Sequence, residues 1–433
     1  MHIRDLANQS VCILGYGREG QASARALEEH AEDCKITIAD KNEEVNVGEY
    51  KAQLGEKWLK NLSKFDVIIK SPGIPPLPEF NEVKEKLTSS TQIFLDTVHE
   101  AGSKVIGVTG TKGKSTTASL IAAILKEDGK DVHLVGNIGL PTLNYLEHAK
   151  KGTWFVMEMS SFQLMDLTVS PHIAVITSFF PEHLDYHIKL QDYELAKAQI
   201  VLHQNKEEDF VFSSYANNAR TIAAYATVKM ENRREYKGED APVELAETHL
   251  KGAHNLLNIA GAWKVAEHLG VEEDTAVRAI KKFKGLAHRM QSLGVLHEIK
   301  WIDDAISTIP ESTLAALQTY GDMVETIIVG GQDRGNDFTS LGREIAESTQ
   351  MKNVILFPES GTPIKEAIAK RAQSHLDIHE VNSMEEAVKI AIKRHDKDRK
   401  DAICLLSPAS PSYNMYKNFE EKGEAFAKAI REA

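Results

Sequence analysis

Three things are scarce in this sequence: cysteine, long apolar runs and net positive charge. Its 433 residues contain only three cysteines, whose spacing matches neither a disulfide framework nor a zinc site and is typical of a reducing cytoplasm. No apolar run approaches the ~20 residues that span a membrane, and the amino-terminal segment has no signal-peptide pattern. A net charge of −12 disfavours binding to nucleic-acid backbones, which need excess lysine and arginine. We therefore expect a cytoplasmic enzyme without a membrane or nucleic-acid partner.

Short apolar runs alternate with helical patterns along almost the whole chain, which predicts the α/β class with parallel sheets covered by helices. At roughly 150 residues per domain, the length predicts three domains, expected at residues 1–92, 93–285 and 286–433. The predicted helices include 21–29, 115–128 and 256–269. The predicted strands are 11–14, 35–39 and 66–70, then 104–108, 154–158, 173–177 and 210–213, and finally 300–303, 326–329, 354–357 and 402–406.

A glycine-rich turn follows the first predicted strand. Gly15, Gly17 and Gly20 form the pattern G-x-G-x-x-G at the start of a helix, and Asp40 ends the next strand twenty residues after Gly20. Such glycines let a backbone approach a pyrophosphate at a helix N-terminus, and the acid accepts ribose hydroxyls. The pattern predicts a pyrophosphate-bearing nucleotide, with NAD or FAD among the possibilities and a turn without any ligand as the alternative.

A second glycine-rich turn, T-G-T-K-G-K-S-T from Thr109 to Thr116, lies between a predicted strand and a predicted helix. Its spacing is a variant of the Walker A pattern: five residues lie between Gly107 and the Gly113-Lys114 pair, whereas the strict pattern has four. Backbone N–H groups of such a loop surround phosphates, Lys114 adds a positive charge, and Ser115 can ligate Mg²⁺. This turn predicts ATP binding.

The second turn resembles the phosphate-binding loop of the Mur ligases, the ATP-dependent amino-acid-adding enzymes of peptidoglycan synthesis. Further runs similar to this family follow in the family's order: Gly136–Gly139, Glu158–Leu164, Glu182–Asp185, Lys197, Gly252–Asn258, His288–Arg289, Leu406–Ser412 and Lys417–Glu420. Two of these runs, Ser-Ser-Phe-Gln-Leu and Ser-Pro-Ala, are most similar to the branch that adds glutamate to UDP-N-acetylmuramoyl-L-alanine. The resemblance implies a Rossmann-like N-terminal domain, a central ATPase domain and a Rossmann-like C-terminal domain in a monomeric enzyme.

The resemblance also implies site residues for ATP, glutamate and a UDP-sugar peptide, with an acyl phosphate as intermediate. ATP would contact Gly110, Thr111, Lys112, Gly113, Lys114, Ser115, Thr116, Asn255, Asn258, Arg289 and Asp304. The UDP substrate would contact Gly17, Arg18, Asp40, Ser71, Pro72, Gly73, Asn137 and His183. Glutamate would contact Thr308, Arg334, Ser412, Tyr413 and Phe419. Two Mg²⁺ ions would be held by Ser115, Thr116, Glu158, His183 and Lys197 as a carbamate, and the catalytic residues would be Lys114, Glu158, His183 and Lys197.

For three of these residues the spacing alone favours a simpler interpretation. In isolation Glu158 reads as a surface acid at a strand end, His183 as a loop histidine, and Lys197 as a solvated helix lysine. Glu19 is not assigned to the site, because the family often has a small polar residue there and an acid is unfavourable beside a diphosphate.

The sequence departs from the glutamate-adding branch at two positions. Ile306 replaces a lysine, and Arg334 stands where the branch has a glutamate-binding lysine, although arginine also grips carboxylates. These changes are similar to a subgroup that adds L-glutamate, so D-glutamate is the family expectation and L-glutamate the alternative. Three other functions stay open: an NAD-dependent oxidoreductase, a nucleotide-binding scaffold without catalysis, and a related ligase with another acceptor, as in folylpolyglutamate synthase.

Overall fold

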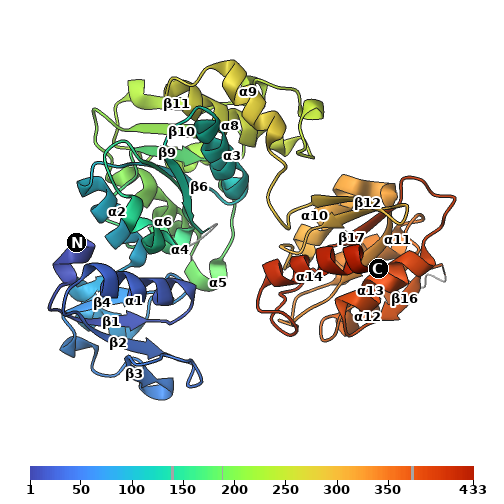
Figure 1. The fold of residues 1–433 in the computed structure, drawn as a ribbon, viewed down its shortest axis with the longest axis horizontal. Helices are drawn as coiled ribbons and strands as arrows, with labels where there is room; N and C mark the ends of the chain where they lie inside the picture. Colours follow the sequence, from blue (N-terminus) through green and yellow to red (C-terminus); the bar gives the residue numbers. More distant parts are fainter. Residues whose placement is uncertain (138–140, 188, 372–374) are drawn as a thin grey trace. The chain divides into compact units, whose positions relative to one another are not determined.

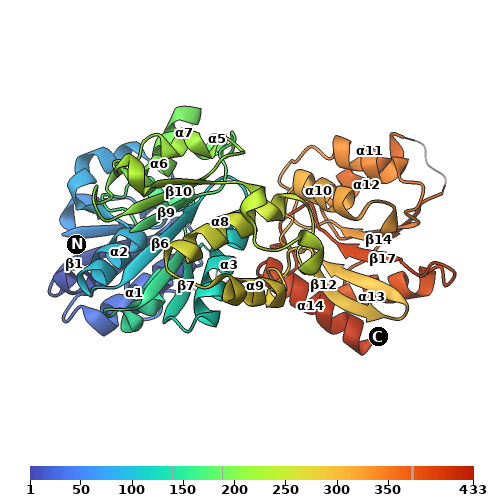
Figure 2. The same ribbon diagram turned by 90° about the horizontal axis from the view of Figure 1, so that it is seen from above.

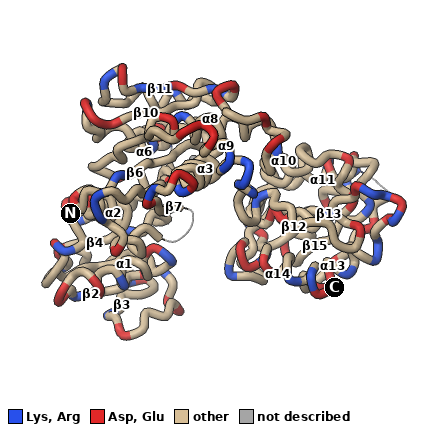
Figure 3. The backbone as a smooth tube through the Cα atoms, turned by 45° about the horizontal axis from the view of Figure 1, so that its top comes forward, with Lys and Arg blue, Asp and Glu red and all other residues tan. Residues whose placement is uncertain are grey.

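The computed structural model describes residues 1–137, 141–187, 189–371 and 375–433. It divides into two compact units, Met1–Phe283 and Lys284–Ala433, which are described separately below. The first unit contains two sheets and the second contains one (Figure 1). Within the described residues, no helix is long and apolar enough to cross a membrane. Acidic and basic residues are interspersed along the backbone of each unit (Figure 3).

The first sheet is parallel and has the order β3-β2-β1-β4-β5. Its strands are β1 (Ser10–Leu14), β2 (Lys35–Asp40), β3 (Lys51–Leu54), β4 (Val67–Lys70) and β5 (Leu87–Thr88). The α-helices of this part are α1 (Arg18–His30) and α2 (Ser90–Glu100), with 3-10 helices at Ile3–Leu6, Gly55–Lys57, Leu62–Lys64 and Pro78–Lys86. Every side chain of β4 is buried, in agreement with the apolar run Val67–Ile69 that precedes Lys70.

The second sheet is also parallel, with the order β11-β10-β9-β6-β8-β7. Its strands are β6 (Lys104–Thr109), β7 (Val132–Gly136), β8 (Trp154–Glu158), β9 (Ile173–Ile176), β10 (Phe210–Ser214) and β11 (Arg233–Tyr236). Its α-helices are α3 (Lys114–Glu127), α4 (Ser161–Leu164), α5 (Leu184–His187), α6 (Leu190–Leu202), α7 (Ala219–Ala223), α8 (His254–His268) and α9 (Glu273–Lys282). Short 3-10 helices lie at Thr142–His148 (η5), Met230–Asn232, Gly238–Asp240 and Leu245–Glu247.

Helices cover both faces of the second sheet. Side chains alternate between the faces of a strand, and accordingly Val105 belongs to one core and Ile106 to the other. Helices α3, α8 and α9 lie next to one another over the face of Ile106 (Figures 1 and 2). The core on the opposite face also includes Val11 and Ile13 of the first sheet, which explains why the first 283 residues form one compact unit.

The second unit contains a six-stranded sheet with the order β12-β13-β17-β14-β15-β16, in which only the β12–β13 pair is antiparallel. Its strands are β12 (Gln291–Leu296), β13 (Ile299–Asp303), β14 (Val324–Val329), β15 (Asn353–Leu356), β16 (Asp377–Glu380) and β17 (Ile403–Leu406). Its helices are α10 (Pro310–Tyr320), α11 (Thr339–Glu347), α12 (Gly361–Ala369), α13 (Met384–Arg394) and α14 (Phe419–Glu432), with a 3-10 helix at Gly321–Met323.

The predicted α/β class with parallel sheets is confirmed, and all eleven predicted strands are present within one or two residues of the expected bounds. Sequence reasoning missed six strands: β3, β5, β7, β11, β12 and β16. All six lie at sheet edges, where half-exposed strands lack a continuous apolar pattern. The unit boundary after Phe283 lies two residues before the domain boundary expected after residue 285, whereas the boundary expected after residue 92 falls inside α2.

Candidate active site

The second glycine turn connects β6 to α3, and two of its glycines have backbone conformations that favour glycine. Gly110 has φ +153°, and a Cβ there would lie 2.0 Å from Thr177 Oγ1. Gly113 has φ +89°, and a Cβ there would lie 2.5 Å from Asn258 Oδ1. The loop is therefore packed tightly between the end of β9 and the start of α8. Helix α3 begins at Lys114, so that its first N–H groups are available to a phosphate, as expected for a nucleotide loop.

Side-chain hydrogen bonds hold this loop in place. The Thr177 hydroxyl donates to the Lys112 carbonyl at 2.6 Å, and the Lys112 N–H donates to Ser178 Oγ at 2.8 Å. Lys114 Nζ donates to the Thr111 carbonyl at 3.0 Å, which places its ammonium group over the loop. The loop is thus pre-organised, with a cation at the position where the sequence predicts the phosphates.

Two predicted ATP-binding residues of α8 lie beside the loop. Asn258 Nδ2 donates to Asn255 Oδ1 at 2.8 Å, and the Thr117 hydroxyl donates to Asn258 Oδ1 at 3.3 Å. Asn255 and Asn258 therefore share one face of α8, as their spacing of three predicts. The structure joins these two asparagines to the start of α3.

Glu158 ends β8 and is only 2% exposed. Its Oε1 accepts a hydrogen bond from Asn137 Nδ2 at 3.0 Å, whereas its Oε2 is buried without a partner among the described residues. Leaving a buried carboxylate oxygen unpaired is costly. Such an oxygen is a preferred ligand for a hard cation. The interpretation of Glu158 as a surface acid is wrong. Two residues of the predicted run after Asn137, Ile138 and Gly139, lie outside the described residues.

Lys197 lies on α6 and is 1% exposed, so its interpretation as a solvated lysine is wrong. Its Nζ donates to the Gly110 carbonyl at 2.9 Å and lies 4.8 Å from the centroid of the Tyr193 ring. Burial lowers the pKa of Lys197 well below its usual value, and the charge of Lys114 lowers it further, while Glu182 and Glu158 oppose the shift. The structure therefore places an amine of increased neutral fraction under the phosphate-binding loop.

His183 is linked to the phosphate loop by Glu182, which contacts both His183 and Lys112 of the loop. Glu182 Oε1 accepts an ion-paired hydrogen bond from Lys112 Nζ at 2.7 Å, and its Oε2 lies 3.8 Å from His183 Nε2. The His183 ring also lies 5.0 Å from the ring of Phe162, which belongs to the Ser-Ser-Phe-Gln-Leu run. Three separate runs of the predicted site thus meet here. Among the described residues, no three His, Cys, Asp or Glu side chains are grouped so that they could hold a metal ion, so any cation here needs further ligands.

The first glycine turn is bound to the residues predicted to act with it. Asp40 Oδ2 accepts from the Tyr16 N–H at 2.6 Å, and the Ser71 hydroxyl donates to the Gly15 carbonyl at 3.0 Å. Gly15 has φ +84°, and a Cβ on Gly20 would lie 2.0 Å from the Gly15 carbonyl oxygen. These contacts bring the ends of β1, β2 and β4 together around one turn, with Gly17 and Arg18 exposed on it.

The loop after β4 also contacts the central part of the first unit. The Tyr186 hydroxyl lies 2.9 Å from both the Pro72 and Ile74 carbonyls, and Lys70 Nζ donates to the Ile74 carbonyl at 3.2 Å. Pro72 and Gly73 are therefore held next to α5, close in sequence to His183. Glu19 interacts with the start of α2: its Oε2 accepts a hydrogen bond from the Ser90 hydroxyl at 2.9 Å, and burial raises the pKa of Glu19.

In the second unit, Asp304 is buried beneath the end of β13. Its Oδ2 accepts from the hydroxyls of Ser307 at 2.6 Å and Ser407 at 2.8 Å, and its Oδ1 accepts from the Met290 N–H at 3.1 Å. Burial raises the pKa of Asp304 to about 6 despite these donors. The neighbouring Arg289 is exposed and contributes an opposing electrostatic effect.

The predicted glutamate-binding residues lie on loops of the second unit. The Arg334 guanidinium lies 5.6 Å from the Tyr413 ring centroid, and the adjacent Ser412 is buried with no partner for its hydroxyl within the described part of the chain. The Phe419 ring lies 6.2 Å from the ring of His288, whose pKa is raised by its hydrogen bond to Asp303. Thr308 is half-buried in the loop before α10.

Two family models match the chain: the Mur ligase middle domain over residues 108–266 and the Mur ligase glutamate ligase domain over residues 288–409. The UDP-N-acetylmuramoylalanine–D-glutamate ligase of Acetivibrio thermocellus is 30% identical over 99% of this chain and 97% of its own. The UDP-N-acetylmuramoyl-L-alanine–L-glutamate ligase of Salinispora tropica is 31% identical over 100% and 99%. The chain belongs to the Mur ligase family.

Solved structures agree with this fold. The UDP-N-acetylmuramate–alanine ligase MurC of Thermotoga maritima matches 98% of this chain and 99% of its own, with 18% identity and a TM-score of 0.62. The MurF ligase of Thermotoga maritima in complex with ADP matches 100% and 97%, with 15% identity and a TM-score of 0.56. Family membership decides against the oxidoreductase alternative for the first glycine turn.

Sequence reasoning missed two residues of this Mur ligase that shape the site. Glu182 pairs with Lys112, and its position directly before His183 in a family-like run was an available signal. Tyr193 is buried, its hydroxyl lies 3.0 Å from Thr111 Oγ1, and its ring lies against Lys197. Tyr193 and Lys197 are four residues apart and therefore lie on one face of α6, and this spacing could have predicted their contact.

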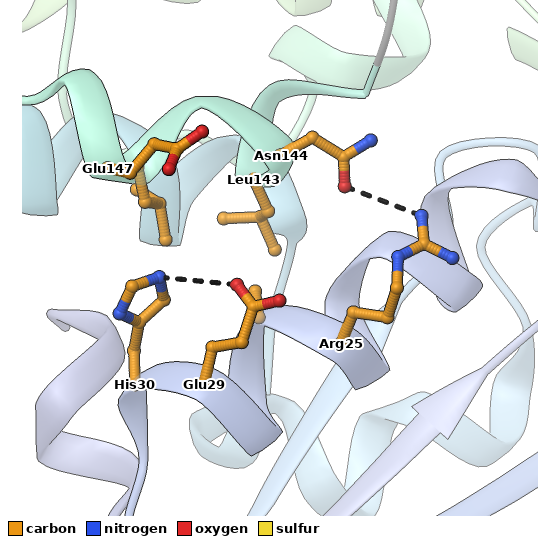
Figure 4. Close-up of a pocket in the computed structure, with 8 residues that line it drawn as sticks. Arg25, Glu29, His30, Leu143, Asn144 and Glu147 are labelled. Carbon is orange, nitrogen blue, oxygen red and sulfur yellow. Dashed lines mark hydrogen bonds and ion pairs between the residues drawn. The ribbon is translucent and has the colours of Figure 1, made fainter.

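A separate open pocket of about 270 Å³ lies between α1 and η5 (Figure 4). Arg25 donates to Asn144 Oδ1 at 3.4 Å across it, and His30 Nε2 lies 3.8 Å from Glu29 Oε2. No predicted site residue is among the described residues that line this pocket. The candidate active site is therefore the set of loops at the ends of β6, β8 and β9 rather than this pocket.

Proposed function

We propose that this Mur ligase uses ATP to join glutamate to UDP-N-acetylmuramoyl-L-alanine through an acyl phosphate. The observation that carries the proposal is that Lys114 and Lys197 both donate to carbonyls of one pre-organised phosphate loop, while Glu158 ends the strand paired with β6, which leads into that loop. Its support also includes the full-length likeness to glutamate ligases with that acceptor in their names. The likeness to an ADP complex of MurF supports the choice of nucleotide.

The loop binds the triphosphate in this proposal. The α3 N-terminus offers N–H donors and a partial positive charge, while Lys114 supplies a full charge near the transferred group. Because the loop is already fixed by Thr177 and Asn258, little ordering is needed when the nucleotide binds. The substrate carboxylate oxygen attacks the γ-phosphorus and ADP leaves; the glutamate amine then attacks the acyl carbon and phosphate leaves.

The donor set fits Mg²⁺. Glu158 Oε2 is a buried carboxylate oxygen without a partner among described residues, and Ser115 and Thr116 lie at the start of α3. We propose that these residues, with His183, hold two Mg²⁺ ions, which when bound neutralise charge between two anionic reactants. Oxygen ligands of this kind are what Mg²⁺ prefers.

Lys197 is proposed to carry a carbamate. Its neutral amine adds to the carbon of CO₂ with loss of one proton, which converts a buried donor into an anionic oxygen ligand. The lowered pKa of Lys197 supports this step, because only the neutral amine is nucleophilic. The ring of Tyr193 limits the positions that the modified side chain can take.

The two remaining substrates are assigned to the other loops. We propose that the first glycine turn, with Arg18, Asp40 and Ser71, binds the uridine diphosphate, and that Asn137 and His183 contact the rest of that substrate. The second-unit loops carrying Thr308, Arg334, Ser412, Tyr413 and Phe419 are proposed to bind glutamate, and Asn255, Asn258, Arg289 and Asp304 to contact ATP. The enzyme is proposed to act as a cytoplasmic monomer on these small molecules.

Phosphate release tests the proposal directly. Purified protein would be incubated with ATP, Mg²⁺, UDP-N-acetylmuramoyl-L-alanine and either D- or L-glutamate. We expect release that depends on the acceptor, on one glutamate enantiomer and on Lys114, with the Lys114→Met variant as control. Ile306 and Arg334 favour a trial of L-glutamate beside D-glutamate. Absence of release with both enantiomers would reject the proposed substrate pair.

A further inference from the structure

Lys422 is another buried lysine, and the proposed mechanism does not use it. It lies on α14, is 1% exposed, and its Nζ donates to the Gly330 carbonyl at 2.7 Å. The same Nζ lies 4.7 Å from the Phe357 ring centroid and 6.0 Å from that of Tyr416. Burial lowers the pKa of Lys422 to about 7. Burying an amine is costly, and within the described part of the chain the Gly330 carbonyl is the one hydrogen-bond acceptor of Lys422 Nζ.

The acceptor belongs to a turn that ties three loops together. Gly330 has φ +104° and its N–H donates to the Pro408 carbonyl at 2.8 Å. The Gly331 N–H donates to Ser360 Oγ at 2.9 Å, and the Gln332 N–H donates to the Pro411 carbonyl at 2.7 Å. The turn 330–332 is therefore bonded to the loops that follow β15 and β17 as well as to β14 itself. A Cβ on Gly331 would lie 2.3 Å from the Pro411 carbonyl oxygen, so the approach is as close as glycine allows.

The segments held by this turn carry three of the five proposed glutamate-binding residues, Arg334, Ser412 and Tyr413. Arg334 lies two residues after Gln332, and Ser412 directly follows Pro411. The Arg334 guanidinium and the Tyr413 ring already lie within 5.6 Å of each other. Any shift of the turn therefore moves both loops, and with them the groups that would hold an amino-acid substrate.

We propose that Lys422 is a positioning residue for the amino-acid site, holding the turn 330–332 so that the Arg334 loop and the Ser412 loop keep their relative position. The substrate affected is a free amino acid with an acidic side chain, so the inference rests on the proposed function. The phosphate loop and the first glycine turn, proposed to bind ATP and the UDP substrate, belong to the first unit. Among the described residues, the contacts of Lys422 Nζ are with Gly330, Phe357 and Tyr416, and they include neither Arg289 nor Asp304.

The kinetic test compares Lys422→Met, Lys422→Arg and Lys428→Met. Lys428 is exposed on the same helix and serves as the matched control. We expect Lys422→Met to raise the KM for glutamate at least tenfold, with kcat and the KM for ATP changed less than twofold. Lys422→Arg keeps a donor for Gly330 and should restore most of the affinity. An equal rise of all KM values, or an unchanged KM for glutamate, would overturn the proposal.

A measurement without substrates separates this inference from the proposed function. Amide hydrogen exchange of the full chain should become faster in Lys422→Met at residues 330–332 and 410–413, and stay unchanged in β13 and in the first unit. This result would support the role of Lys422 even if no glutamate ligase activity were found. Unchanged exchange at both segments would overturn the proposal, because Lys422 would then not hold the turn. Faster exchange throughout the second unit would also overturn it, because Lys422 would then stabilise the whole unit rather than this turn.

Discussion

Replacing Lys197 by methionine tests whether its amine is carbamylated. Methionine keeps an unbranched apolar side chain in the buried position but removes the nucleophile. An exposed lysine with a pKa of about 10.4 is neutral in only about one molecule in a thousand at pH 7.4. Because burial and the charge of Lys114 lower the pKa of Lys197, its neutral fraction is larger than that of an exposed lysine. CO₂ addition should therefore be selective for this lysine, and should persist at pH values that fully protonate exposed lysines.

The assay combines activity with a direct signal for the modification. Protein equilibrated with ¹³C-bicarbonate should show a carbamate carbon resonance that disappears in Lys197→Met, and phosphate release should fall on the order of 100-fold, the upper range for disturbing a metal site. Lys189→Met, at the exposed N-cap of the same helix, should change neither measurement. Activity of Lys197→Met within twofold of the unchanged protein, or a resonance that survives the substitution, would refute the reasoning.

Three further substitutions test the rest of the site. Glu158→Gln should lower phosphate release at least tenfold, because the neutral amide lacks the negative charge and one of the two oxygens that a carboxylate offers a cation; unchanged release would remove Glu158 from the metal site. Gly113→Ala should weaken ATP binding by calorimetry at least tenfold through its clash with Asn258, whereas Gly129→Ala, with similar φ but open space, should not. Folding raises the pKa of Asp304 to about 6 from about 4, so the protein loses stability as pH rises through that window. Urea unfolding at pH 4.5 and 7.5 should show a loss of about 2 kcal/mol that Asp304→Asn abolishes, and an equal pH dependence in the variant would contradict this.

The interior strands and both glycine turns could be predicted because their signals are local. Strand β14 is buried along its whole length and ends in the apolar run Ile327–Val329, while the first and second turns need glycine at fixed positions. Edge strands carry no such signal. The four residues of β16, Asp-Ile-His-Glu, contain a single apolar side chain, because one edge of that strand faces solvent rather than another strand.

The environment of the site residues could not be predicted from the same patterns. Lys197 reads as a solvated lysine because its helix gives no sign that β6 and the phosphate loop cover it. Glu158 is similar: its position at a strand end was predicted, but its burial and its unpaired oxygen depend on neighbours more than twenty residues away. The likeness to Mur ligases indicated roles for these residues without their surroundings. Neither a local sequence pattern nor the family likeness indicated a role for Lys422, since its acceptor Gly330 is 92 residues away in the sequence.

One physical rule unites the three sheets: in parallel sheets, ligand-binding loops gather where the carboxyl ends of the strands meet. The first turn follows β1 and meets Asp40 at the end of β2, while the phosphate loop follows β6 beside Glu158 at the end of β8. The turn 330–332 follows β14 beside the loop after β17. Each site is thus assembled from strands that are neighbours in space but distant in sequence. Lys422 donates to the carbonyl of Gly330 in the turn that holds these loops, so it acts on the proposed binding site without contacting the ligand. Its substitution should therefore change the affinity for the amino acid but not the rate of phosphoryl transfer.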